Sequence, residues 1–112
     1  MSPLQRSLRL LETLGYDLIR KVEVWNSFAH KRQDLWGYDV LAAGHGHLLF
    51  VQVTDGAHKA DHLKALRASE ATAKLLKNGA KCVLHSWRCG GPQGKRKTWA
   101  VTETVVDHAV TP

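Results

Sequence analysis

The stretch from residue 39 to residue 54 constrains the fold of this chain more than any other. Asp39–Ala43 is apolar after its first residue, Gly44–His47 is typical of a turn, and Leu48–Thr54 is rich in apolar and β-branched residues. Two such runs joined by a short glycine-containing turn are the pattern of a β-hairpin. We therefore predict a hairpin of two buried strands.

Helices are predicted on either side of this hairpin. Ser2 can cap a helix that begins at Pro3, Gln5 can complete a capping box, and Gly15 can end the helix in a left-handed conformation. Residues 57–78 have the alanine and lysine content of a second helix, which ends at an Asn-Gly pair. The predicted hairpin therefore lies between two predicted helices in the sequence.

Three further strands complete the predicted order. Residues 18–25 alternate with period two, and residues 81–88 and 97–106 are also expected to form strands. Residues 26–38 show no clean period, and we expect an irregular excursion there. The order α, β, β, β, α, β, β indicates one α/β domain over residues 1–112, with a mixed central sheet flanked by helices.

The composition favours a folded, basic, intracellular protein. Of 112 residues, 44% are hydrophobic, and no run approaches the roughly 20 apolar residues of a membrane span. Cys82 and Cys89 are too few for a disulfide framework and suit a reducing compartment. The 16 Lys and Arg against 10 Asp and Glu give a net charge of +6. This charge indicates a polyanionic partner, or else a solvated basic surface.

Two polar residues stand at positions expected to be buried. Asp39 opens one strand and Gln52 lies inside the next, where a polar group without a partner costs about 1–3 kcal/mol. Gln52 and Thr54 share a strand face, so the three residues could line a pocket of oxygen atoms. Alternatively, Asp39 caps a strand, Gln52 bonds a neighbouring backbone group, and Thr54 is an ordinary strand residue.

The chain resembles the PD-(D/E)XK nuclease superfamily, and within it the small Holliday-junction-resolvase-like members, some of which are phage-borne. That family has a restriction-endonuclease-like αβββαβ core. It carries an acidic residue on the first helix, an aspartate at the start of the second strand, and an acid-x-lysine triplet on the third. Here Glu12 falls on the first predicted helix, Asp39 opens the second strand, and Gln52-Val53-Thr54 occupies the triplet.

The resemblance implies a DNA endonuclease that depends on Mg²⁺ or Mn²⁺. Such an ion polarises the scissile phosphate and activates a bound water, held by oxygen ligands. Asp39 would be the central ligand, and Gln52 would offer its side-chain carbonyl. Glu12, with Asp34 as a second choice, would have to restore the missing negative charge.

The triplet departs from the family pattern at its last position. Thr54 stands where the family has a lysine that orients the attacking water or neutralises charge. Lys59, near the start of the next helix, could supply a relocated lysine, although a surface role is the alternative. A catalytically inactive DNA-binding module on the same fold is therefore the second reading.

Basic residues are expected to contact the DNA backbone on both sides of this pocket. Such contacts give affinity without base readout, so we expect recognition of a branched or structured DNA shape. The resemblance also implies a homodimer, because a symmetric junction is most simply met by a symmetric protein. The candidate DNA-binding residues are Lys31, Arg32, Lys59, Lys64, Lys95, Arg96 and Lys97.

Two further interpretations concern a histidine pair and a protein partner. His58 and His62 stand four residues apart on one helix face, and without a metalloprotease glutamate we expect them to meet solvent or DNA. A different class of function is a small interaction or inhibitor protein whose basic face meets an acidic protein.

Overall fold

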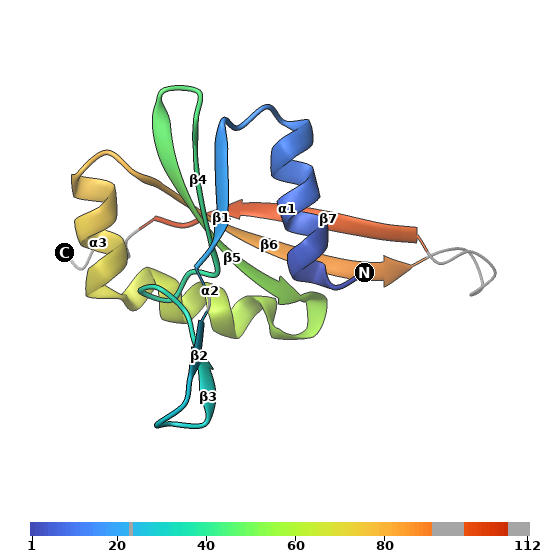
Figure 1. Ribbon diagram of the computed structural model, residues 1–112, viewed down its shortest axis with the longest axis horizontal. Coiled ribbons are helices and arrows are strands. Elements are labelled where there is room, and N and C mark those ends of the chain that lie inside the picture. Colours follow the sequence, from blue (N-terminus) through green and yellow to red (C-terminus); the bar gives the residue numbers. More distant parts are fainter. Residues whose placement is uncertain (23, 91–97, 108–112) are drawn as a thin grey trace.

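A five-stranded mixed sheet forms the centre of the computed structural model, which describes residues 1–22, 24–90 and 98–107 (Figure 1). The strand order is β1-β4-β5-β6-β7, with β5 and β6 parallel and the other pairs antiparallel. This confirms the predicted α/β class. The strands are β1 (Leu18–Lys21), β4 (Val40–Gly44), β5 (His47–Asp55), β6 (Lys81–Gly90) and β7 (Thr98–Val105).

The predicted hairpin is confirmed as strands β4 and β5. Their register pairs Val40 with Val51 and Gly44 with His47. The two residues between the strands, His45 and Gly46, both have positive φ angles, of 53° and 82°. Such a two-residue turn matches the twist of the strands that it joins.

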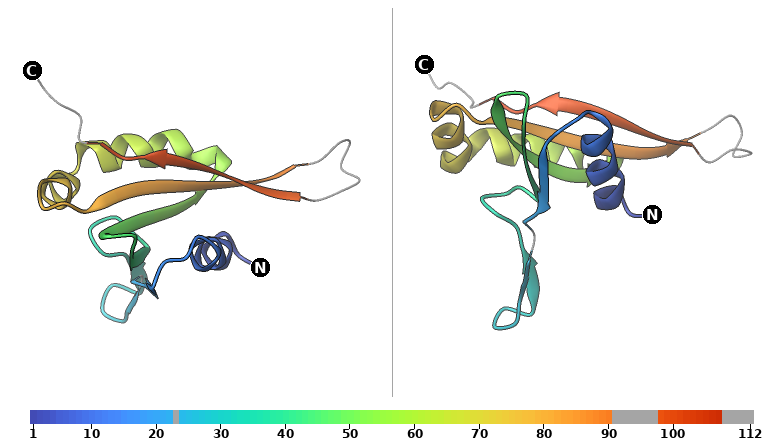
Figure 2. Two further views of the ribbon diagram at one scale, coloured as in Figure 1. Left: turned by 90° about the horizontal axis from the view of Figure 1, so that it is seen from above. Right: turned by 45° about the horizontal axis from the view of Figure 1, so that its top comes forward.

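Helices cover both faces of the sheet (Figure 2). Helix α1 (Pro3–Thr13) begins with the predicted capping box, in which Ser2 and Gln5 bond reciprocally. Its Leu11 packs on one face of the sheet, in a cluster with Val40 and Val51. The opposite face packs against the segment between β5 and β6, which comprises η1 (Gly56–His58), α2 (Lys59–Ala68) and α3 (Glu70–Lys77).

The prediction of one continuous helix over residues 57–78 is wrong. Ser69 is extended, with ψ of 130°, and separates α2 from α3. Serine is a favoured residue at helix starts, where its backbone is not helical. The break lets α3 turn so that the buried Thr72 hydroxyl meets the Tyr38 hydroxyl at 2.7 Å.

The predictions for residues 18–25 and 26–38 also need correction. Strand β1 ends at Lys21, because its partner β4 begins only at Val40. Beyond Lys21 the chain leaves the central sheet, so its backbone N–H and C=O groups need other partners. Strands β2 (Val24–Asn26) and β3 (Lys31–Gln33) form a separate antiparallel ribbon that stands away from the sheet (Figure 1). We call residues 24–33 the arm.

The two late strands are confirmed as β6 and β7.

In the part of the chain that the structure describes, no helix combines the length and apolar character needed to cross a bilayer.

Candidate metal and DNA-binding site

Asp39 lies where strands β1, β4 and β5 meet. Its backbone N–H donates to Val51 O at 2.9 Å, and its carbonyl accepts from Val22 N–H at 2.8 Å. Its carboxylate turns toward β5, where Oδ2 accepts from the Val53 N–H at 3.0 Å. The backbone therefore holds the Asp39 side chain directly beside Gln52.

Gln52 is 7% exposed and lies on the face of the sheet covered by α2. Its amide can take two orientations that differ by a half turn. In the first, Nε2 lies 3.2 Å from Nδ1 of His62, and Oε1 faces the acceptors Gly37 O and Asp39 Oδ2. In the second, the nitrogen donates to Gly37 O and to Asp39 Oδ2, and the oxygen accepts from His62.

The surrounding groups favour the second orientation, because every hydrogen-bonding group around the amide is then satisfied without an ion. The first orientation would bring three oxygen atoms, from Gly37, Asp39 and Gln52, together without a donor, so it would require a cation among them. Carboxylate, amide and backbone carbonyl oxygens are the donors that hard divalent cations bind.

A tight turn brings Gly37 to this point. Leu35 and Tyr38 exchange backbone hydrogen bonds of 2.9 Å, and between them Trp36 and Gly37 have φ angles of 55° and 91°. The Asp34 carboxylate accepts from the Gly37 N–H at 3.2 Å. Asp34, which the sequence offered as a metal ligand, therefore holds the turn in the structure.

Thr54 and Lys59 do not join Asp39. Thr54 is 8% exposed and pairs in register with Ser86 of β6. Lys59 lines a pocket of about 650 Å³ together with Ser86 and Arg88. The structure therefore places Lys59 beside residues of β6, the strand that follows β5 in the sheet order.

Glu12 also lies apart from Asp39. It is exposed near the end of α1, where Leu14 O contacts His45 Nε2 in the β4–β5 turn at 2.8 Å. Asp39 directly precedes the opposite end of β4, and this strand of 5 residues is about 16 Å long at the usual rise of a strand. Asp39 is therefore the one sequence-predicted carboxylate that meets Gln52 in the described residues.

His62 is a member of the site that the sequence analysis did not find. It was expected to meet solvent or DNA, yet it is partly buried against Gln52. The sequence did contain a signal for His62, because a buried glutamine needs a hydrogen-bond partner and a polar residue on the following helix can supply one. His58 instead pairs with Asp55 at 2.8 Å, and this hydrogen bond lowers the pKa of the Asp55 carboxyl.

In the described part of the chain, one carboxylate, that of Asp39, lies at Gln52 and could bind a metal ion. Within residues 1–22, 24–90 and 98–107, no three His, Cys, Asp or Glu side chains are grouped as metal ligands. A cation at Asp39 would draw its remaining protein ligands from the neutral oxygens of Gly37 and Gln52. Such a set fits Mg²⁺ or Mn²⁺ in kind, because these ions retain several waters.

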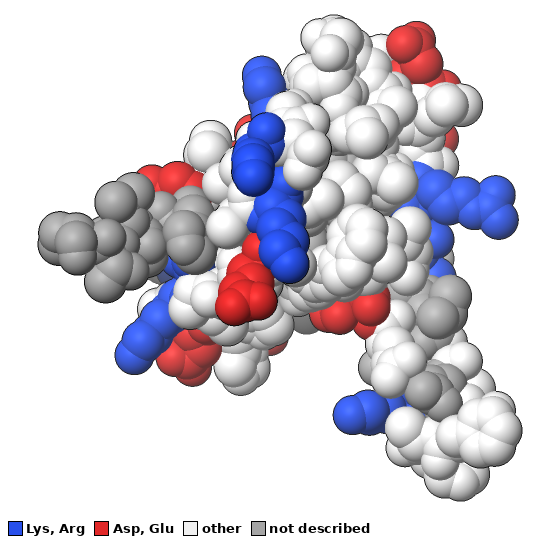
Figure 3. Space-filling model, turned by 90° about the vertical axis from the view of Figure 1, so that its left-hand side faces the viewer, with Lys and Arg blue, Asp and Glu red and all other residues white. Residues whose placement is uncertain are grey.

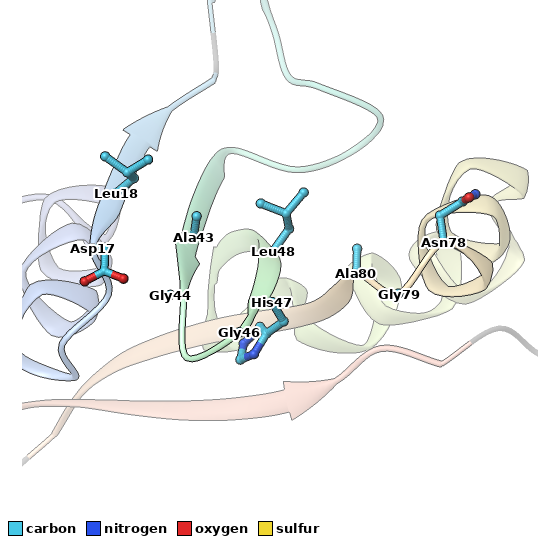
Figure 4. Close-up of a pocket in the computed structure, with 10 residues that line it drawn as sticks. All are labelled: Asp17, Leu18, Ala43, Gly44, Gly46, His47, Leu48, Asn78, Gly79 and Ala80. Atoms are coloured by element: carbon cyan, nitrogen blue, oxygen red, sulfur yellow. The ribbon is translucent and has the colours of Figure 1, made fainter.

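A second pocket, of about 530 Å³, lies at the other end of β4 and β5 (Figure 4). Much of its wall is backbone from Gly44, Gly46 and Gly79, with Asp17 and His47 as its titratable side chains. It contains none of the residues that the sequence analysis selected.

The candidate DNA-binding residues are spread over several elements. Lys31 is exposed on β3, and Lys64 is exposed on α2. Arg32 belongs to β3, but its side chain lies outside the described residues, as do Lys95, Arg96 and Lys97. Figure 3 shows a row of basic side chains on the side of the molecule that carries α3. Exposed lysines in this region are Lys74, Lys77 and Lys81.

Comparison of the chain with protein-family models, curated proteins and solved structures found no match.

Proposed function

We propose that this protein is a metal-dependent endonuclease that acts on branched or structured DNA. The observation that carries the proposal is the meeting of the Asp39 carboxylate, the Gln52 amide and the Gly37 carbonyl. These groups come from the start of β4, the middle of β5 and the turn before β4. Carboxylate, amide and backbone carbonyl oxygens are the donors that Mg²⁺ and Mn²⁺ bind, which supports a metal site here.

Asp39, Gln52 and Gly37 O would hold the ion, with Mg²⁺ or Mn²⁺ as the cofactor. A bound divalent cation supplies an activated water and neutralises charge on the phosphate. The chain's own contribution is orientation. An ion would require the Gln52 amide to turn by a half turn from its hydrogen-bonded orientation, and Nε2 would then lie 3.2 Å from His62 Nδ1, which could accept from it.

A non-catalytic DNA-binding module is the second candidate, and specific observations favour it. Thr54 occupies the position where a lysine was expected, and Lys59 lines a pocket with Ser86 and Arg88 of β6. Among the described residues, the Asp39 carboxylate is the one that meets Gln52, so the site offers a cation less negative charge than the two acids of the family pattern would. In this reading, the Gln52 amide keeps the hydrogen-bonded orientation permanently.

A cleavage assay separates the two candidates. Labelled four-way junction, flap and plain duplex are incubated with the protein in Mg²⁺ and in Mn²⁺. We expect the junction or the flap to be cut, and Asp39→Asn to reduce the cleavage rate at least 100-fold, by the usual order of magnitude for a lost electrostatic group. Glu12→Gln is the matched control and should cleave at the wild-type rate, because Glu12 lies at the far end of β4.

A second variant tests the metal site directly. Gln52→Glu adds a carboxylate beside Asp39 and should tighten Mn²⁺ binding about tenfold or more, as measured by electron paramagnetic resonance titration. Salt-sensitive DNA binding without cleavage, unchanged in Asp39→Asn, would establish the non-catalytic module instead. Failure to bind any DNA at low salt would exclude both candidates and favour a protein partner.

A further inference from the structure

The arm carries exposed aromatic side chains. Trp25 on β2 is 60% exposed, and Phe28 in the turn is 96% exposed. Large aromatic rings normally contribute most when they are buried, either in a core or against a partner. Both rings are therefore exposed on one short ribbon, where each could stack on a partner.

The charge of the arm narrows the choice of partner. Residues 24–33 contain Lys31 and Arg32 but no Asp or Glu, and His30 precedes this basic pair. Aromatic rings beside positive charge, without any acidic residue, complement nucleic acid, because bases stack on rings while cations contact phosphates. An acidic protein surface would match the charge, whereas nucleic acid matches the charge and also presents a flat base beside every phosphate.

The shape and position of the arm fit the same partner. Strands β2 and β3 pair with each other and project from the body of the protein (Figures 1 and 2). A two-stranded ribbon has the width that a DNA groove admits. The chain leaves β3 at Gln33, forms the turn that carries Gly37, and reaches Asp39 directly. The base of the arm therefore adjoins the candidate metal site.

We propose that the arm binds unstacked bases of branched DNA, with Trp25 and Phe28 as stacking surfaces and Lys31 as a phosphate contact. This inference rests on the proposed function and specifies its substrate. Bases at a branch point are already partly unstacked, so stacking them on the arm costs less than opening a continuous duplex.

A fluorescent base analogue tests the inference. The base 2-aminopurine is placed at the branch point of a junction, and its emission and the binding anisotropy are measured at low salt without divalent ions. Wild-type protein should change the emission on binding. Trp25→Ala and Phe28→Ala should each weaken junction binding about tenfold to a hundredfold and remove the emission change. Phe28→Trp should retain both signals.

Controls distinguish stacking from a general loss of affinity. Trp99→Ala removes a ring on β7 that is 39% exposed and lies against Arg6, and it should leave junction binding within about twofold. Lys31→Ala should weaken junction and duplex binding alike, since a phosphate contact is common to both.

Three results would overturn the inference. If wild-type protein binds the junction and both alanine variants bind it equally well with the same emission, the arm inference fails while the proposed function stands. If wild-type protein binds no DNA, both fail. If the alanine variants instead abolish self-association in sedimentation velocity and leave DNA binding intact, the arm is a contact between copies of the chain.

Discussion

His85, the most completely buried of the histidines that the structure describes, has a fixed set of partners. It is 0% exposed, with Nδ1 2.9 Å from Ser7 Oγ and Nε2 3.0 Å from Glu103 Oε2. The Trp87 indole N–H donates to Ser7 Oγ at 2.8 Å, so the Ser7 hydroxyl proton is directed at His85 Nδ1. His85 then donates from Nε2 to Glu103. Ser7 is also 0% exposed, so the Ser7 hydroxyl is closed to solvent and this group joins α1 to the sheet.

Stability should therefore depend on the protonation of His85. Burial lowers the pKa of His85 below its ordinary value of 6.5, against an opposing effect of Glu103. The unfolded chain then binds more protons below about pH 6.5, so the free energy of unfolding falls as pH drops toward the folded pKa, by up to about 1.4 kcal/mol per pH unit. Urea denaturation between pH 7.5 and 5 measures this slope.

His85→Gln is the comparison variant for this measurement, because it leaves the other six histidines in place. It should be less stable at neutral pH and show a shallower decline on acidification. Equal slopes in the two proteins would contradict a role for His85.

At the scale of elements, the β4–β5 hairpin depends on a close backbone approach. A Cβ atom on Gly44 would lie 2.9 Å from Tyr16 Cα and 3.1 Å from Asp17 N. Asp17 N–H also donates to Ala43 O at 2.9 Å, so the chain entering β1 lies directly against the end of β4. Only glycine allows this spacing without movement of the backbone.

Gly44→Ala should consequently destabilise the protein by about 1–3 kcal/mol, the usual cost of an added methyl group in a tightly packed place. Gly90→Ala is the matched control at the end of β6, where an added Cβ meets nothing within 4 Å. We expect the control to stay within about 0.5 kcal/mol of wild type in urea denaturation. Similar losses in both variants would show that the approach at Gly44 is unimportant.

At the scale of the whole molecule, the net charge of +6 is distributed over several surfaces. Exposed lysines occur on the arm, on α2 and along the α3 side of the molecule. Some cations are already paired within the chain, as Arg67 is with Asp107 at 2.9 Å. The unpaired excess gives long-range attraction to a polyanion and little base specificity.

DNA affinity should therefore fall steeply with salt. Raising monovalent salt from 50 to 200 mM should raise the Kd for the junction at least about tenfold. Lys64→Ala should reduce the slope of log K against log salt by about 0.9, the expected effect of one lost phosphate contact. Arg67→Ala, on the same helix but paired with Asp107, should leave the slope unchanged. A slope near zero in wild-type protein would contradict binding through phosphates.

The sequence alone correctly predicted the elements that depend on local patterns. The capping box of α1, the β4–β5 hairpin and strands β6 and β7 follow from turn residues and periodicity, which act over a few neighbouring positions. The same local patterns misjudged residues 18–33 and the single helix over 57–78. In the first case the length of β4 limits its neighbour β1, and in the second Ser69 turns α3 so that Thr72 reaches Tyr38.

For the candidate site, the sequence by itself determined that Asp39 and Gln52 need polar partners, and the hairpin register then placed them together. The tertiary structure decided the rest: it added Gly37 and His62, and it left Glu12 and Lys59 elsewhere. The physical reason is that periodicity determines which face of its own element a residue occupies. How separate elements pack decides which side of a strand and which end of a sheet that residue reaches.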